Sequence, residues 1–313
     1  MTLTRTDSLT HSWTMMGGSA RMWVVGASAA TGIGREDAIA LVEGRGAHLE
    51  QSWSRFLATS DLSRLADAAG APTIVEPETV QLLRAMLDGW HETDRDFDPT
   101  LLPAVIAEGY GRSLVDPSRA TQLPTTARSR TDLDAMRIDG ATVTLPVGTA
   151  LDPGGIGKGL AADLIAADLM AAGALGCLVE VGGDLRVMGE APDGVAWRIA
   201  VDDPFQPGTE RGQIRVPDAG VATSSQRKRR WMTDSGTERH HLIDPSTQRS
   251  AGSSIQTVTV IAASAARAEV LTKPGFVRPV DEYLDWIPTR GAAALLIDAD
   301  GTELTTSNWS TYA

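Results

Sequence analysis

Apolar residues recur at helical spacing in two segments near the start of the chain, 34–56 and 75–92. The first segment carries an expected core stripe of Ile39, Leu41, Val42 and Leu49. The second follows a turn at Pro72. Between them, Ser60 precedes Asp61-Leu62-Ser63 and predicts the N-cap of a short helix, because a serine hydroxyl can accept a hydrogen bond from a free N–H of the first turn.

Alternating apolar and polar residues, bounded by turn residues, predict strands in much of the remaining chain. Residues 136–150 form an expected hairpin that turns at Asp139-Gly140, and the last hairpin turns at Asp300-Gly301. Further strands are expected at 15–25, 195–204 and 211–225, and a strand that passes into a helix at 258–273. Helices that alternate with hairpins predict an α+β fold, with mixed α/β layers of antiparallel sheets and packed helices, rather than a doubly wound parallel sheet.

The bulk properties limit the possible partners. The chain has 313 residues, 28 basic and 40 acidic, and a formal net charge of −12, so its global field attracts neither nucleic acid nor an anionic membrane.

Cys177 lies in an apolar run and is expected to be a small core residue. Residues 1–14 are polar without an apolar segment, which predicts a disordered tail, no signal peptide and a cytoplasmic location. Residues 15–313 are expected to form one domain, which could divide into intertwined lobes at 15–135 and 136–313.

The segment 152–189 contains the most informative pattern, a glycine turn that ends in Lys158 and leads into an Ala-rich helix. Glycines let main-chain N–H groups approach an anion closely, and a helix N-terminus adds a positive dipole end. The segment therefore indicates a phosphate cradle, although an ordinary glycine-rich turn is the alternative. It is not a Walker A loop, because Gly159 follows the lysine where that loop has Ser or Thr.

Other polar clusters leave two interpretations open. The basic cluster 227–230 follows Ser224 and Ser225, and it is either a local anion site or a solvated loop. In HHLIDP (240–245), one histidine is either a general base oriented by Asp244 or a residue satisfied structurally by the turn. Glu269 and Lys273 stand four apart on the last predicted helix, which favours an i,i+4 ion pair.

In their order along the chain, these motifs resemble the ApbE family of FAD:protein FMN transferases. The resemblance covers nearly all of the chain after residue 14. The matching stretches are Met16-Gly17, Ser54-Arg55-Phe56, 60–65, Thr93-Asp94, 97–100, the Gly-Gly-x-x-Lys-Gly of 154–159, Asp163, Gly182-Gly183-Asp184, 222–225 and HHLIDPSTQ.

The resemblance implies a fold related to the tunnelling fold and a phosphoryl-transfer reaction. Family members bind FAD, split its pyrophosphate, attach the FMN half to a threonine or serine hydroxyl of an acceptor flavoprotein, and release AMP. For this chain it implies that Lys158 and nearby N–H groups hold the diphosphate, and that His241, oriented by Asp244, takes the proton from the hydroxyl. The implied flavin-binding residues are Met16, Gly17, Asp152, Gly154, Gly155, Gly159, Asp163, Gly182, Gly183, Asp184, Ser224, Ser225 and Arg230.

The resemblance also implies a Mg²⁺ site, formed by a helix aspartate, a threonine four residues later and a carbonyl of the glycine turn, here that of Gly157. Glu269 and Lys273 replace the first two. Because an ammonium repels a divalent cation, we expect Lys273 to stand where Mg²⁺ otherwise sits, paired with Glu269 and directed at the phosphates. The same substitutions support an alternative: an FAD-binding carrier or sensor, or an FAD pyrophosphatase, without transferase activity. Trp231 or Trp53 is a candidate for stacking on the flavin ring.

Overall fold

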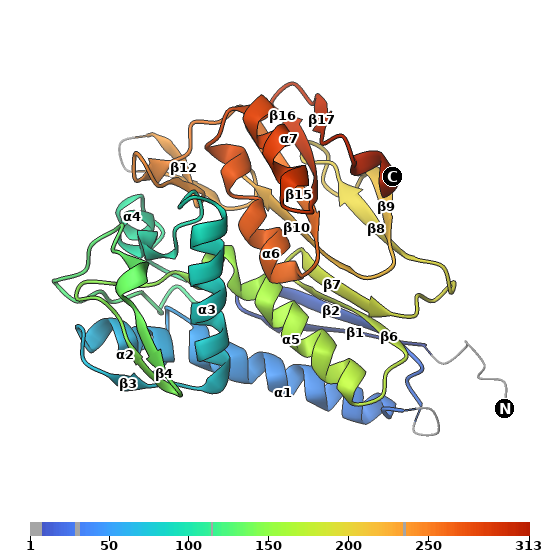
Figure 1. Ribbon diagram of the computed structural model, residues 1–313, viewed down its shortest axis with the longest axis horizontal. Coiled ribbons are helices and arrows are strands. Elements are labelled where there is room, and N and C mark those ends of the chain that lie inside the picture. Colours follow the sequence, from blue (N-terminus) through green and yellow to red (C-terminus); the bar gives the residue numbers. More distant parts are fainter. Residues whose placement is uncertain (1–7, 29–31, 114, 234–235) are drawn as a thin grey trace. The chain divides into compact units, whose positions relative to one another are not determined.

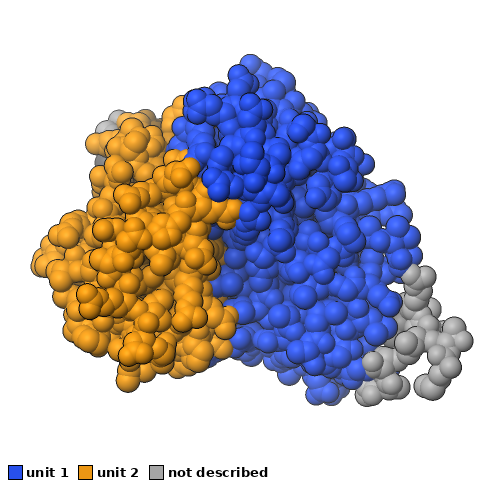
Figure 2. Space-filling view, in the orientation of Figure 1, with its two compact units in different colours: residues 1–48, 158–225, 254–313 blue, residues 49–157, 226–253 orange. Residues whose placement is uncertain are grey.

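The computed structural model describes residues 8–28, 32–113, 115–233 and 236–313. The chain divides into two compact units, and each unit is assembled from separate stretches (Figure 2). Unit 1 contains residues 1–48, 158–225 and 254–313, and unit 2 contains residues 49–157 and 226–253. The expected division into 15–135 and 136–313 therefore does not match the units, because a single cut cannot separate segments that the chain visits more than once.

Unit 1 is built on an eight-stranded sheet in the order β1-β2-β6-β7-β10-β15-β16-β17 (Figure 1). Every neighbouring pair is antiparallel, as the alternating pattern predicted. The strands are β1 (Ser8–Met15), β2 (Gly18–Val25), β6 (Gly176–Val181), β7 (Asp184–Gly189), β10 (Ala219–Ser225), β15 (Ile255–Ala262), β16 (Ala293–Asp298) and β17 (Glu303–Thr305). The α+β fold class is confirmed.

One face of this sheet packs on a two-stranded ribbon of β8 (Trp197–Asp202) and β9 (Glu210–Val216). In β8, buried and exposed residues alternate, so Trp197 and every second residue after it face the core. Trp197 shares one apolar cluster with Leu178, Val187 and Leu295 of the large sheet. The burial of these strands follows directly from their period of two.

Helices pack on the opposite face of the sheet. The Sγ atom of Cys177 on β6 lies 3.6 Å from the main-chain oxygen of Ala166 on α5 (Gly157–Ala171), and burial raises the pKa of this thiol to about 12. The expectation of a small core cysteine is confirmed. Helix α6 (Ala265–Leu271) packs on β10 and β15. Helix α7 (Val280–Thr289) was not predicted, and it buries Tyr283, whose hydroxyl donates to the carbonyl of Leu271 over 2.9 Å.

Helix α1 (Arg35–Trp53) begins in unit 1 and ends in unit 2, where short helices and ribbons follow. The remaining unit 2 elements are α2 (Asp61–Asp67), β3 (Thr73–Ile74), α3 (Pro77–Glu92), α4 (Leu102–Ala107), β4 (Arg137–Asp139), β5 (Thr142–Thr144), β11 (Arg230–Met232), β12 (Glu238–His240), β13 (Ile243–Asp244) and β14 (Arg249–Ser250). Ser60 caps α2 as expected, since its hydroxyl accepts from the N–H of Ser63 at 3.2 Å. The predicted hairpins at Asp139-Gly140 and Asp300-Gly301 are also confirmed.

The expected tail is wrong for residues 8–14, while residues 1–7 lie outside the described part. Ser8–Met15 forms β1, which pairs with β2 along its whole length. Only Leu9 and Met15 of this strand are buried, because an edge strand needs few apolar residues on its inner face. The expected strand start at residue 15 also shifts. Met16 and Gly17 form the two-residue turn between β1 and β2, and both have positive φ, the pattern of a type I′ hairpin.

Among the described residues, no helix is long and apolar enough to cross a lipid bilayer.

Gly220 on β10 provides a test of how closely α6 packs on the sheet. A Cβ at this position would overlap the main chain of Ser264 and Ala265 at the start of α6. We expect Gly220→Ala to lower the free energy of unfolding by about 1–3 kcal/mol, as overpacking does. Gly44 on the exposed side of α1 has open space around its Cα, so Gly44→Ala is the matched control and should be neutral or stabilising. Urea unfolding measures both, and equal effects of the two variants would contradict the close approach.

Candidate functional site

Three segments of unit 1, far apart in the sequence, bring charged side chains together. Lys158 is the second residue of α5, Asp184 opens β7 after the turn at Gly182-Gly183, and Glu269 lies within α6. The Lys158 ammonium contacts the Asp184 carboxylate, and it lies 2.7 Å from Oε1 of Glu269. Asp184 and Glu269 are buried, with 3% and 1% of their surfaces exposed. The lysine of the predicted phosphate cradle is thus held by two carboxylates of the protein itself.

Glu269 also fills the anion position at the N-terminus of α5. Its Oε2 accepts a hydrogen bond from the N–H of Gly159 at 2.8 Å. This N–H is one of the groups that a helix leaves without an internal partner, and the helix dipole favours a negative charge there. The carboxylate therefore stands where the sequence predicted a phosphate oxygen. In this structure Lys158 and Gly159 organise the protein before any ligand binds.

Protonation states follow from burial and from these contacts. Burial disfavours a charged ammonium, but the carboxylates of Asp184 and Glu269 outweigh it and raise the pKa of Lys158. Burial, with repulsion from Glu269, raises the pKa of Asp184 to about 6, although Lys158 acts in the opposite direction. At neutral pH the cluster thus contains a charged lysine between two carboxylates.

Lys273 lies directly after the C-cap residue of α6, and its ammonium is surrounded by oxygens. Its Nζ lies 2.9 Å from Oγ of Ser224, 2.9 Å from the main-chain oxygen of Glu269 and 3.0 Å from Oγ1 of Thr272. A positive charge is favourable at this position because the C-terminus of a helix carries the negative end of its dipole. We call Ser224 Oγ, Glu269 O and Thr272 Oγ1 the oxygen cage.

The expected ion pair between the side chains of Glu269 and Lys273 is not formed. Helix α6 ends at Leu271, so Lys273 lies beyond the regular helix and turns toward the last carbonyls. The Glu269 carboxylate points the other way, to Lys158 and Gly159. Helical spacing alone predicted the pair, whereas partners on α5 and β10 decide the actual contacts.

Asp163, on the same helix as Lys158, anchors the start of α6. Its carboxylate accepts hydrogen bonds from the N–H groups of Ala265 at 2.8 Å and of Ala266 at 2.9 Å. Arg186 lies 3.6 Å away and pairs with Asp218 at 2.6 Å. Burial raises the pKa of Asp163 to about 6, with the two N–H donors acting against it. Asp163 was predicted to bind flavin, and in this structure its visible role is to cap α6.

The glycines before Asp184 both have positive φ, which favours glycine, and Gly182 also lies close to Lys158. A Cβ on Gly182 would lie 3.0 Å from Cδ of Lys158, and Gly182 has φ +61°. The N–H of Gly182 donates to the carbonyl of Ser19 at 2.9 Å, immediately after the Met16-Gly17 turn. Two turns that carry predicted flavin-binding residues therefore lie side by side in unit 1. Ser225, the last residue of β10, is buried next to Ser224.

The remaining predicted residues of the glycine turn and the basic cluster belong to unit 2. Asp152 caps the short turn Pro153–Gly155 by accepting from the N–H of Gly154 at 3.0 Å. Gly155 completes that turn, and Gly157 is the last residue of unit 2 before Lys158. Arg230 is exposed on β11, where it pairs with Glu238 at 2.8 Å.

Within HHLIDP, the structure separates the roles of the two histidines. Nε2 of His240 lies 3.0 Å from the carbonyl oxygen of Ala251, and burial lowers the pKa of His240. His241 is partly exposed, with Nδ1 3.3 Å from the carbonyl oxygen of Arg229. That Asp244 orients His241 stays a prediction, and the structure shows Asp244 in another contact. The Asp244 carboxylate instead accepts from the N–H and Oγ of Ser246, both at 2.7 Å, and so shapes the turn that follows it.

Sequence reasoning missed Glu108, which is not among the expected site residues. This buried carboxylate accepts from the N–H of Ser250 at 3.0 Å, and it pairs with Arg239 at 3.0 Å and Arg249 at 3.2 Å. It thereby holds both ends of the segment that carries His241. No signal in the sequence identifies Glu108, because it is flanked by turn residues and the two arginines that pair with it are distant along the chain.

Only one of the two tryptophans proposed for flavin stacking is accessible. Trp53 is 1% exposed, so it belongs to the core and is excluded as a platform. Trp231 is partly exposed, lies 5.7 Å from Tyr110 between ring centroids, and donates its indole N–H to the carbonyl of Glu108 at 2.8 Å. Trp231 remains a candidate.

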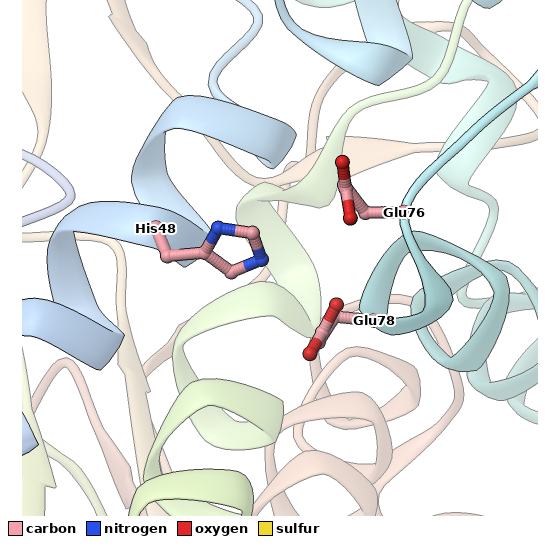
Figure 3. Close-up of side chains that lie close together, drawn as sticks. All are labelled: His48, Glu76 and Glu78. Atoms are coloured by element: carbon pink, nitrogen blue, oxygen red, sulfur yellow. The ribbon is translucent and has the colours of Figure 1, made fainter.

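The divalent cation implied by the resemblance does not fit the donor set of unit 1. Mg²⁺ needs oxygen ligands at about 2.0–2.1 Å in octahedral geometry, usually with one or two carboxylates. Here the Glu269 carboxylate is held by Lys158 and Gly159, while the oxygen cage surrounds the Lys273 ammonium. Figure 3 draws a separate set of possible ligands, His48 with Glu76 and Glu78. His48 belongs to unit 1 and the glutamates to unit 2, so no metal site is assigned to them.

A family model described as the ApbE family matches residues 16–296. The FAD:protein FMN transferase of Vibrio cholerae is 29% identical over 226 residues, which span 70% of this chain and 66% of that protein. The one of Rhodobacter capsulatus is 30% identical over 221 residues, which span 68% of this chain and 41% of that protein. The chain therefore spans less than two thirds of the length of these two relatives.

Solved structures support the fold. The ApbE protein of Thermotoga maritima superposes with a TM-score of 0.84 at 24% identity, covering 98% of this chain and 99% of that one. The flavinyl transferase ApbE of Pseudomonas stutzeri gives a TM-score of 0.80 at 25% identity, covering 99% and 98%. The architecture of the chain is thus that of these proteins.

Removing the charge of Lys158 should destabilise unit 1. In Lys158→Met, the buried carboxylates of Asp184 and Glu269 lose the ammonium that contacts both of them. We expect a loss of about 3–5 kcal/mol in the free energy of unfolding, as when one partner of a buried pair is removed. Adding Asp184→Asn to Lys158→Met should restore part of the loss. If the double variant is less stable than the single one, repulsion between these carboxylates is not the cause.

Asp163 should make the stability of the protein depend on pH. Its folded-state pKa of about 6 is raised above the usual 3.8, so its contribution is fully present below pH 4 and is lost as the pH rises through about 6. The free energy of unfolding should therefore fall by about 3 kcal/mol more in the wild type than in Asp163→Asn between pH 4 and pH 7. Urea titrations across this range test it, with Asp168→Asn on the same helix as control. Parallel pH profiles for the wild type and Asp163→Asn would contradict the assignment.

Proposed function

Because the chain belongs to the ApbE family, we propose that it binds FAD and transfers the FMN half to a threonine or serine hydroxyl of an acceptor protein, releasing AMP. The observation that carries the proposal is the family match over residues 16–296, which includes every segment of the Lys158 cluster. The curated relatives that match most of this chain are named FAD:protein FMN transferases, which supports the same reaction.

We assign the phosphate end of FAD to the region around the N-terminus of α5. Lys158 contributes there by neutralising Asp184 and Glu269, since two unbalanced carboxylates would repel a diphosphate. This role differs from the direct phosphate contact that the sequence indicated. The glycines of the two neighbouring turns, at Met16-Gly17 and Gly182-Gly183, allow a ligand to approach the main chain closely.

The proposed step balances without an additional reagent. The acceptor hydroxyl oxygen attacks the phosphorus of the FMN half and forms a new P–O bond. The bond from that phosphorus to the bridging oxygen breaks, and AMP leaves with the electron pair. We assign the hydroxyl proton to His241, because the family resemblance indicates this residue and because burial lowers the pKa of His240, whose Nε2 lies 3.0 Å from the carbonyl oxygen of Ala251.

A second function, FAD binding without transfer to protein, is favoured by one observation. Lys273 occupies the oxygen cage that would otherwise be open to a cation. If the reaction depended on a divalent ion bound there, this chain would hold FAD as a carrier or sensor. With water in place of the hydroxyl, it would act as a pyrophosphatase and release free FMN and AMP.

Intact-mass spectrometry separates these functions. The protein is incubated with FAD and candidate acceptor flavoproteins, and the acceptor mass and released nucleotides are measured. We expect an acceptor mass increase of one FMN with an equal amount of AMP. His241→Asn should reduce the transfer rate by about 100-fold or more while leaving the Kd for FAD nearly unchanged, since loss of a general base acts on the chemical step.

The matched control is His91→Asn, an exposed histidine of unit 2 that contacts only Asp134 among acids. This variant should transfer FMN at the wild-type rate. Free FMN and AMP without a labelled acceptor would support the pyrophosphatase, and tight FAD binding without any product would support the carrier. Undiminished transfer by His241→Asn would exclude the assigned base.

A further inference from the structure

We propose that Lys273 is a built-in replacement for a divalent cation, so that this chain binds the diphosphate of a flavin nucleotide without a metal ion. The inference rests on the proposed function for the identity of the ligand. The filling of the oxygen cage is a property of the protein alone and can be tested without FAD.

Oxygen atoms surround Nζ of Lys273 as they would surround a cation. Three oxygens lie within 3.0 Å of it, a hydroxyl from β10 and a carbonyl and a hydroxyl from the end of α6. Hard cations take oxygen ligands, main-chain carbonyls among them, but this set contains no carboxylate to balance a divalent charge. The three N–H donors of an ammonium match three acceptors, so Lys273 satisfies the cage by itself.

The oxygen cage is held by internal hydrogen bonds and its side chains are buried. Thr272 is fully buried and Ser224 is 9% exposed. The Thr272 hydroxyl donates to the Glu269 carbonyl at 2.6 Å and lies 2.7 Å from Oγ of Ser224, so the three oxygens hold one another in place. A site that is preorganised in this way presents its remaining lone pairs to the Lys273 ammonium without rearrangement.

The charges of Lys158, Lys273, Asp184 and Glu269 balance one another. Lys158 and Lys273 carry two positive charges, and Asp184 and Glu269 carry two negative charges, so the cluster is balanced. A divalent ion added to the cage would meet the Lys273 ammonium at contact distance, and two cations repel each other strongly beside the buried side chains of Ser224 and Thr272. The Lys273 ammonium also lowers the pKa of Asp184 as a fixed positive charge, and unlike a metal ion it does not have to bind from solution.

The experiment uses Mn²⁺ as a paramagnetic probe and FAD as the ligand. Wild type, Lys273→Thr and Lys273→Met are titrated with Mn²⁺, and the signal of free Mn²⁺ is followed by electron paramagnetic resonance. We expect no Mn²⁺ to bind at the cage of the wild type. Lys273→Thr should bind one ion, because this substitution empties the cage and adds an oxygen. Lys273→Met should bind none, because it fills the space with an apolar side chain.

FAD binding is then measured by flavin fluorescence with EDTA or with Mg²⁺. The wild-type Kd should change by less than about twofold, whereas Mg²⁺ should tighten binding to Lys273→Thr by about tenfold or more, equivalent to about 1.4 kcal/mol. Lys273→Met should bind FAD more weakly than the wild type in both buffers.

Strict Mg²⁺ dependence of FAD binding in the wild type, or Mn²⁺ bound at its cage, would overturn the proposal even if the variants fail to fold. Failure of Lys273→Thr to bind Mn²⁺ while folded would overturn the assignment of the cage. If no form binds FAD, the proposed function fails, whereas the Mn²⁺ titration still decides whether Lys273 replaces a cation.

Discussion

The contact of Lys158 with two buried carboxylates is the interaction on which the rest of unit 1 depends. It joins the first turn of α5, the start of β7 and the middle of α6, which are up to 111 residues apart in the sequence. A buried charge is tolerated only with a partner, so each of these side chains fixes the position of the others. Gly182 follows from the same constraint, because a Cβ there would lie 3.0 Å from Cδ of Lys158, whereas Gly159 is needed where α5 meets the main chain of Ala265 at the start of α6. The site is a consequence of how the three elements meet.

Local features of the chain could be predicted from the sequence because they depend on neighbouring residues. The Ser60 cap, the hairpin turns at Asp139-Gly140 and Asp300-Gly301 and the core position of Cys177 each follow from the chemistry of a few adjacent positions. The strand at Ser8–Met15 was missed because its outward face is polar and its register is set by β2.

Lys158, Asp184 and Glu269 were expected from motifs and contact one another in unit 1, but these contacts were not predicted. Glu269 and Lys273 suit a helical ion pair by spacing, yet each finds a nearer partner from another element. The contacts of Asp244 and Glu108 were also not predicted. The Asp244 carboxylate hydrogen-bonds within its own turn, and no local sequence pattern identifies Glu108. Residue types at a site can be inferred from motifs, whereas hydrogen-bond partners depend on the tertiary approach of distant segments.

The hairpin turn at Met16-Gly17 also constrains how the N-terminal part of the chain can change in length. Two residues with positive φ fix the register of β1 on β2, and β2 in turn is paired with β6 beside the Gly182 turn. Because side chains alternate between the faces of a strand, a one-residue insertion that shifts β1 along β2 would turn Leu9 and Met15 to solvent and bring their polar neighbours inward. Evolutionary length changes in this hairpin are therefore expected to occur in steps of two residues, or to be absorbed beyond the start of β1.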